Sequence, residues 1–274
     1  MANYGRDPVS AIVESEAEGE VAEIFADIRA TMGIPVLTSI WRTLVSVDGG
    51  LVAGWTAAKP LYLSGQPVVA LERVLASASL PVLEPLGVGQ LASAGVSEEE
   101  ASAVRAIIEA YNRSNGMNML ALTALLVEPA PPIGNNTPAQ LPPPWPTLRP
   151  LLSKAEISKD TWELLQDINS FGGGSTDGGL ATLWRHLAHW PGLLAVIRAS
   201  LAPAHHSGDL ANAIKEVYEL VKAEAFQLAN LRCEPVVLPV AARDMIKNYV
   251  TTPEAVARMV TIGHILASWL AMEA

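Results

Sequence analysis

The feature that most restricts the fold of this chain is a pattern of residues that occurs twice. The stretch "SIWRTLVSVD", which begins at Ser39, returns as "TLWRHLAHWP", which begins at Thr182. At this spacing, identical residues coincide in pairs that include Trp41 with Trp184, Arg42 with Arg185, Leu44 with Leu187, Gly49 with Gly192, Leu51 with Leu194 and Pro60 with Pro203. The sequence therefore predicts two copies of one structural unit.

A proline-rich segment separates the copies. Residues 129–150 read "PAPPIGNNTPAQLPPPWPTLRP", with nine prolines in twenty-two residues. A segment so rich in proline cannot form the interior of a helix or sheet, because each proline lacks a backbone N–H and fixes φ. We interpret this segment as a linker. The predicted organisation is a first repeat at 1–128, the Pro-rich linker at 129–150 and a second repeat at 151–274.

Apolar residues in both copies recur at the spacing of an amphipathic helix. The two sets are Val21, Ile24, Phe25 and Ile28, and Leu180, Leu183, Trp184 and Leu187. Half of the 274 residues are hydrophobic, and runs of β-branched residues are short. We predict an all-α fold in which a five- to six-helix unit is duplicated about a pseudo-two-fold axis. A pocket for a ligand is expected at the seam between the halves.

Two helix limits follow from capping signals. Ser97 with Glu100 forms a capping-box pattern, and the helix that it opens is expected to end near Asn115–Gly116, where a glycine commonly stops a helix. In the second copy, "TTPE" at 251–254 is expected to open the last helix in the same way.

Charge and hydropathy exclude several classes of partner. The net charge is -10, whereas nonspecific affinity for nucleic acid requires lysines and arginines that neutralise phosphates. No apolar run approaches the length of a membrane span, so no membrane partner is expected. The first residues lack the pattern of a secretory signal, and a cytoplasmic location is the resulting expectation.

The familiar signatures of cofactor and metal sites are missing from the sequence. The glycine-rich stretch at 171–179 has no strand before it, so it is not a dinucleotide fingerprint, and there is no phosphate loop. His186 and His189 lie at helical spacing, but no acidic residue on that face completes a metal site. The single cysteine, Cys233, excludes an intrachain disulfide. We expect neither a cofactor nor a metal.

Two repeated features have both a structural and a functional interpretation. We interpret two matched pairs as equivalent ion pairs, Asp27 with Arg42 and Asp167 with Arg185. Either arginine would also suit a substrate carboxylate. The matched tryptophans, 41 and 184, are interpreted as core anchors, and as the walls of a central cavity in the alternative hypothesis.

Three stretches carry a family resemblance: "EVAEIFADIRATMGIP" at 20–35, "GVSEEEASAVRAIIEAYNRSNGMNMLALTALL" at 95–126 and "LAHWPGLLAVI" at 187–197. Through them the chain resembles the group I, non-stereospecific (DL) 2-haloacid dehalogenases, all-helical proteins of two tandem repeats. The resemblance implies a small carboxylic acid as substrate and a pocket between the repeats. There an aspartate, helped by an asparagine, activates water that displaces the halide directly. It is also compatible with a homodimer.

The resemblance assigns roles to residues of this chain by position. The helper asparagine falls on Asn115, and the family's aspartate falls on Leu183, which cannot accept a proton from water. Two residues are candidates to replace this base: His186, one turn beyond Leu183, and Asp177, in the glycine-rich loop. Their simpler interpretations are a solvated histidine and a helix cap. The positions expected to contact substrate are Val36, Ser39, Ile40, Trp41, Asn112, Thr182, Leu183 and Trp184.

Three functional hypotheses remain at this point. The chain is a haloacid dehalogenase-type hydrolase with a displaced base, a related helical enzyme of altered chemistry on a more apolar substrate, or a ligand-binding homologue without catalysis.

Overall fold

The computed structural model describes residue 12 and residues 14–129, 144–173, 180–232, 236–252 and 255–272. Within these ranges the regular elements are α-helices and three short 3₁₀ turns, so the all-α prediction is confirmed. The α-helices are α1 (Gly19–Met32), α2 (Ser39–Leu44), α3 (Gly50–Leu63), α4 (Gln66–Ser77), α5 (Gln90–Ser93), α6 (Glu98–Ala124), α7 (Lys159–Ser170), α8 (Thr182–Leu187), α9 (Pro191–Ser207), α10 (Asp209–Leu228), α11 (Val240–Thr251) and α12 (Val256–Ala271). No helix in these ranges is long and apolar enough to cross a membrane.

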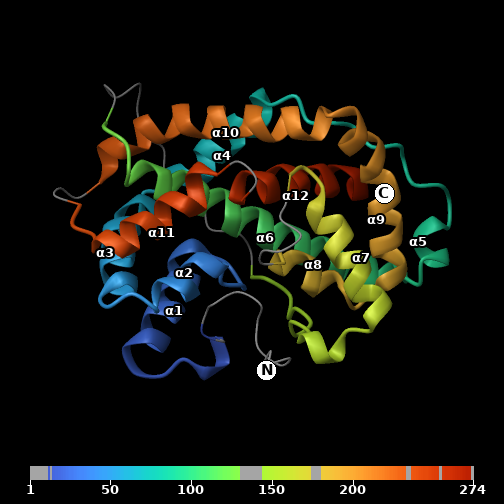
Figure 1. Cartoon of the computed structure of the whole chain (residues 1–274), viewed down its shortest axis with the longest axis horizontal. Coiled ribbons are helices and arrows are strands. Elements are labelled where there is room, and N and C mark those ends of the chain that lie inside the picture. The colour runs from blue at the N-terminus through green and yellow to red at the C-terminus, as the bar shows by residue number, and fades with distance from the viewer. Residues whose placement is uncertain are drawn as a thin grey trace.

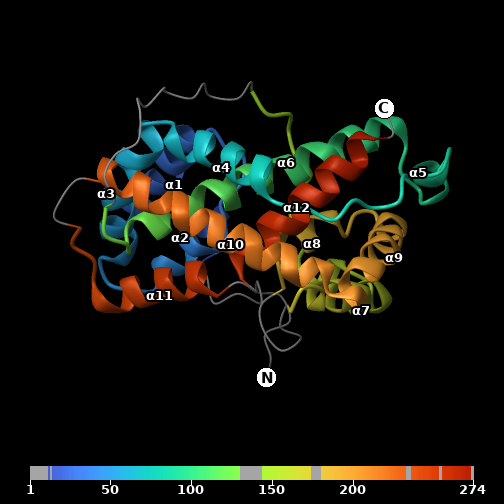
Figure 2. The same cartoon turned by 90° about the horizontal axis from the view of Figure 1, so that it is seen from above.

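Helices from both sides of the linker form the centre of the molecule. Helices α6 and α12 pack along each other, and α4 and α10 pack beside them (Figure 1, Figure 2). Helices α1–α3 lie at one end of this central layer and α7–α9 at the other. One hydrophobic cluster runs through all of these elements, and it joins fully buried residues such as Ile107 and Leu266. The two halves therefore share a core.

Several element bounds repeat at the spacing of the sequence pattern. Helices α2 and α8 have six residues each, and both ends of α8 lie 143 positions beyond those of α2. Helices α4 and α10 also begin 143 residues apart, each after a glycine with positive φ, 69° at Gly65 and 87° at Gly208. Among the described residues, six helices stand on each side of the linker. The duplication itself stays a prediction.

Helix α6 begins as expected but does not end as expected. The capping box is present, because Ser97 Oγ accepts from the Glu100 N–H at 3.2 Å and Glu100 Oε2 accepts from the Ser97 N–H at 3.0 Å. The helix then continues through Gly116 to Ala124, so the predicted end near Asn115–Gly116 is wrong. A Cβ on Gly116 would lie 2.4 Å from Leu71 Cδ2 of α4. This glycine serves the close packing of two helices, and that contact outweighs its poor helix propensity.

The start of the last helix also differs from the prediction. Helix α12 begins at Val256, after Ala255, without a side-chain cap. Thr252 instead follows the last residue of α11. Residues 253 and 254 lie outside the described residues, and so do 130–143 of the linker.

The described end of the linker is fastened to helices of both halves. Trp145 Nε1 donates to the Gly33 carbonyl at 2.9 Å, and Arg149 pairs with Glu100 at 3.0 Å. Arg185 of α8 donates to the Leu152 carbonyl just beyond the linker, at 2.7 Å. The segment 144–153, called the strap below, forms one wall of the larger of the two cavities described next.

The predicted ion pairs are wrong in their partners. Asp27 accepts from Lys59 Nζ and Trp55 Nε1, both at 2.7 Å, and the Lys59 bond is the main cause of its lowered pKa. Asp167 pairs with Arg198. Both partners come from the third helix of each half, because the arginines of α2 and α8 are buried on the side that faces the strap.

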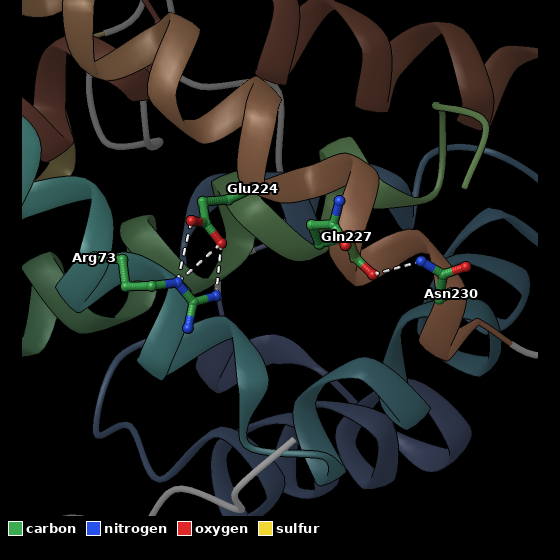
Figure 3. Close-up of polar contacts among 4 residues, drawn as sticks. All are labelled: Arg73, Glu224, Gln227 and Asn230. Carbon is green, nitrogen blue, oxygen red and sulfur yellow. Dashed lines mark hydrogen bonds and ion pairs between the residues drawn. The ribbon is translucent and has the colours of Figure 1, made fainter. Parts of the chain in front are cut away.

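An exposed ion pair joins α4 to α10. The Arg73 guanidinium contacts both carboxylate oxygens of Glu224, with Nη2 to Oε2 at 2.6 Å and Nε to Oε1 at 3.1 Å (Figure 3). At the end of α10, the side-chain amide of Asn230 donates to the backbone carbonyl of Gln227 at 3.1 Å. Solvent screens such a pair, which therefore contributes at most about 1 kcal/mol.

Candidate functional site

A cavity of about 270 Å³ lies where helices of the two halves meet. Its polar lining includes Ser39 of α2, Tyr111 and Asn115 of α6, Thr182 of α8 and Arg258 of α12. Leu183 belongs to its apolar lining, with Leu180, Val256 and Met259. The structure thus brings together four residues that the sequence assigned to the site: Ser39, Asn115, Thr182 and Leu183.

The most strongly charged group of this cavity is the Arg258 guanidinium. The residue is 4% exposed. Its Nη1 donates to the Asn169 carbonyl at 2.9 Å and its Nη2 to Asn169 Oδ1 at 3.3 Å. Asn169 Oδ1 also accepts from the Ala181 N–H at 3.1 Å, which ties the guanidinium to the start of α8. Burial lowers the pKa of Arg258 to about 10, so it remains cationic at neutral pH.

Sequence reasoning missed Arg258. The only signal for it is a cation within the apolar stretch "AVARMVTIG" at 255–263, where buried charge is rare unless it has a structural or functional purpose. Tyr249 of α11 was missed as well. Its hydroxyl is buried and makes no hydrogen bond of normal geometry within the described residues, although the Thr38 hydroxyl lies close by. Burial raises the pKa of this phenol, which therefore stays protonated and offers a hydrogen-bond donor.

A buried network fixes the α2 side of the cavity. Asn118 Nδ2 donates to Thr38 Oγ1 at 2.5 Å. Asn118 Oδ1 accepts from Trp41 Nε1 at 3.0 Å and from the Tyr62 hydroxyl at 2.7 Å. The Trp41 ring also meets the Trp55 ring edge-on, at a centroid distance of 5.5 Å. The first tryptophan of the repeat is thus a core anchor that holds the residue before α2 in place.

A second cavity, of about 810 Å³, adjoins the first. The two share Tyr111 and Thr182 in their linings. The larger one is bounded by the strap and by side chains that include Val36, Arg42 and His186. Tyr111 therefore stands on the boundary between the two cavities.

His186 is buried, with 3% of its surface exposed, so its interpretation as a solvated histidine is wrong. Its Nε2 lies 2.5 Å from the Arg149 carbonyl of the strap, and its Nδ1 lies 3.3 Å from the Tyr111 hydroxyl. A carbonyl only accepts hydrogen bonds, so Nε2 carries the proton and Nδ1 accepts from the tyrosine. Burial is the main cause of the lowered pKa of His186, which keeps the ring neutral at pH 7.

Other predicted site residues do not line the smaller cavity. Ile40, Trp41 and Trp184 are at most 3% exposed and line neither cavity within the described residues. Their side chains point into the core, as expected for the tryptophans. Asn112 faces α12, where its Nδ2 donates to the Gly263 carbonyl at 2.9 Å. Val36 lines only the larger cavity. Asp177 lies outside the described residues.

The lining that the structure describes for the smaller cavity contains no carboxylate and no imidazole. Leu183, at 2% exposure, occupies the position that the family resemblance assigns to the base. The described part of the chain also has no group of three or more His, Cys, Asp or Glu side chains that could hold a metal ion. The cavity offers a cation, hydrogen-bonding side chains and an apolar wall.

Comparison with known proteins establishes the fold. The sequence matches no protein-family model and no curated protein. Among solved structures it is similar to a D-2-haloacid dehalogenase mutant in complex with D-2-CPA, with a TM-score of 0.71 and 15% identity. It is also similar to a D-2-haloacid dehalogenase with L-LA (TM-score 0.69, 15% identity) and to a further mutant (0.66, 14%). Each match covers 97% of this chain and 95% of the other. The chain therefore has the all-helical fold of the D-2-haloacid dehalogenases.

Proposed function

We propose that the protein binds a small 2-substituted carboxylic acid in the 270 Å³ cavity and acts as a 2-haloacid dehalogenase-type hydrolase. The observation that carries this proposal is the buried Arg258 guanidinium, which lines the cavity together with an apolar wall. The fold shared with the D-2-haloacid dehalogenases supports it.

The lining matches the two ends of such a ligand. Arg258 suits the carboxylate, because its guanidinium is a buried cation that lines the cavity and attracts an anion. Leu183, Val256 and Met259 suit the 2-substituent, which is apolar. In the proposed reaction Asn115, which lines the cavity, holds a water whose oxygen displaces halide from the 2-carbon and leaves a 2-hydroxy acid.

The rate of this reaction is expected to be low. A positioned general base contributes about 10²- to 10⁴-fold, and Leu183 contributes none. A second candidate function, binding of the acid without catalysis, is favoured by the same observation. The more apolar substrate of the second hypothesis is disfavoured, because it would place an uncharged group against the buried cation of Arg258 without a compensating negative charge.

The test is calorimetric titration with 2-chloropropionate together with a halide-release assay. Arg258→Gln should weaken binding by about 10- to 150-fold, which corresponds to a charged hydrogen bond of about 1.5–3 kcal/mol. Arg243→Gln, on the exposed face of α11 away from both cavities, is the matched control and should bind like the parent. No binding by the parent, or equal binding by Arg258→Gln, would overturn the proposal. Binding by the parent without halide release would favour the second candidate.

A further inference from the structure

We propose that a third cavity, between α10 and α11, binds an amphipathic carboxylate, a molecule with one anionic end and an apolar body. The cavity has a volume of about 310 Å³ and lies over the C-terminal end of α6. It shares no described lining residue with the two cavities above. The proposal goes beyond the proposed function, because it concerns a separate site with its own ligand.

The arrangement of three helices produces this cavity. Helices α10 and α11 each pack against α6, and in the described part of the chain they do not pack along each other (Figure 1). On α11 the lining residues Arg243, Lys247 and Val250 recur at spacings of four and three, so they share one face of that helix. Tyr218 and Val221 line the cavity from α10. Two helix faces and the end of α6 thus enclose the space.

The floor of the third cavity is apolar. Met119, Val221 and Val250 line it and are at most 1% exposed. Thr123 lines it too, but its hydroxyl donates to the Met119 carbonyl at 2.6 Å, so the hydrogen of this group is used within α6. A hydrocarbon body placed on this floor is removed from water without displacing a polar partner of the lining.

The chain that follows α6 forms the remaining wall and is held in place. Leu126 and Val127 both line the cavity. The Arg232 guanidinium donates to the Val127 carbonyl at 2.6 Å and to the Ala124 carbonyl at 3.1 Å. The wall is therefore part of the folded structure before any ligand binds, as is usual for small-molecule sites.

The rim of the third cavity is positively charged. Three exposed cations line it, Lys222, Arg243 and Lys247, against one carboxylate, Asp244. This excess is opposite in sign to the net charge of -10 of the chain. Lys222 lies 4.0 Å from Glu219, whereas Arg243 and Lys247 form no ion pair within the described residues. Cations above an apolar floor match a carboxylate that is attached to a hydrocarbon chain.

Octanoate is the probe, and two matched compounds separate its charge from its chain. Calorimetric titration of the full chain, below the concentration at which octanoate forms micelles, should show saturable binding that weakens as salt is added. Octylammonium has the same chain with the opposite charge, and acetate has the charge without the chain. Each of the two should bind at least about 10-fold more weakly than octanoate.

Substitutions at the rim and at the wall locate the binding. Arg243→Gln combined with Lys247→Gln should weaken octanoate binding by about 10- to 25-fold, because an exposed ion pair contributes up to about 5-fold. Lys159→Gln combined with Lys215→Gln removes the same charge from exposed positions that line none of the three cavities, and it should bind like the parent. Val127→Trp, which fills the cavity and keeps its cations, should weaken binding by at least about 10-fold. The exposed double variant keeps the test decisive if this tryptophan prevents folding.

The outcomes also distinguish the third cavity from the smaller one. Arg258→Gln should leave octanoate binding unchanged, and the rim double variant should leave 2-chloropropionate binding unchanged. No binding of octanoate by the parent, or equal binding by the rim double variant and the parent, overturns the proposal. Octylammonium that binds as tightly as octanoate overturns it as well, since apolar contact alone would then explain the affinity. Loss of octanoate binding in Arg258→Gln would assign the probe to the smaller cavity, which contradicts the third cavity and leaves the proposed function standing.

Discussion

Leu183→Asp is the substitution that most directly probes the cavity. The residue is 2% exposed and lines the cavity next to Thr182, so a carboxylate there would face the space that Asn115 and Arg258 also line. If the proposed geometry is right, this carboxylate accepts a proton from the water and raises the rate of halide release by about 10²- to 10⁴-fold.

The stability cost of this substitution can be worked out from the burial of Leu183. Loss of a buried leucine side chain removes about 1.5–3 kcal/mol of hydrophobic stabilisation. A buried carboxylate adds a desolvation cost of several kcal/mol, which the guanidinium of Arg258 in the same cavity offsets in part. A net loss of about 3–5 kcal/mol lies below the usual 5–15 kcal/mol stability of a domain, and for a chain of this size it lowers the Tm by roughly 6–15 °C.

Leu183→Asn is the matched control, because asparagine has nearly the shape of aspartate but cannot act as a base. The assay is halide release from 2-chloropropionate at a temperature at which circular dichroism shows all three proteins to be folded. Halide release should rise in the aspartate variant and stay at the parent level in the asparagine variant. The inferred position of Leu183 relative to the ligand is refuted if both variants fold and bind the acid but release halide at the same rate.

Two further predictions concern stability. Burial lowers the pKa of His264 to about 4, below its ordinary value of 6.5. As the pH falls, the unfolded chain therefore binds a proton at this residue before the folded chain does. The free energy of unfolding decreases between about pH 6.5 and pH 4 as a result. This contribution, up to about 3 kcal/mol, is measured by urea titration at a series of pH values. In His264→Gln the loss of stability on acidification should be smaller by this contribution, and equal pH profiles for the two proteins would contradict this cause. Gly116→Ala should destabilise by about 1–3 kcal/mol, because the new Cβ would meet Leu71, whereas Ser102→Ala on the exposed side of α6 should be neutral or stabilising. Thermal unfolding measures both, and a stabilised Gly116→Ala would refute the close approach of α4 to α6.

Local patterns predicted much of the helical framework. The spacing of apolar residues indicated the buried faces around Phe25 and Trp184, both at most 1% exposed. The pair Ser97 and Glu100 indicated the start of α6, because a capping box involves only residues three positions apart. Such signals are contained within one turn of helix and therefore survive in the sequence alone.

Features that depend on distant contacts could not be predicted in this way. In the sequence alone, Gly116 has the pattern of a helix end. Its actual role, close packing against Leu71 of another helix, is visible only in the folded structure. Arg258 lines the cavity only because α12 packs against α6, which lies far from it in the sequence. The predicted partner of Asp27 was wrong because the direction of a side chain on the six-residue α2 cannot be read from spacing, and Lys59 reaches it from α3 instead.

The network around Asn118 has a consequence for ligand polarity. Its amide nitrogen donates to Thr38 Oγ1, while its oxygen is occupied by Trp41 and Tyr62. Because Thr38 Oγ1 accepts the Asn118 hydrogen bond, the threonine hydroxyl still has its own hydrogen to donate, and Thr38 lines the hollow. Together with the protonated Tyr249, this edge of the hollow presents hydrogens rather than lone pairs. A ligand bound there is stabilised if it has hydrogen-bond acceptors on the side that faces this edge. An N–H or O–H group of the ligand in the same place would weaken its binding.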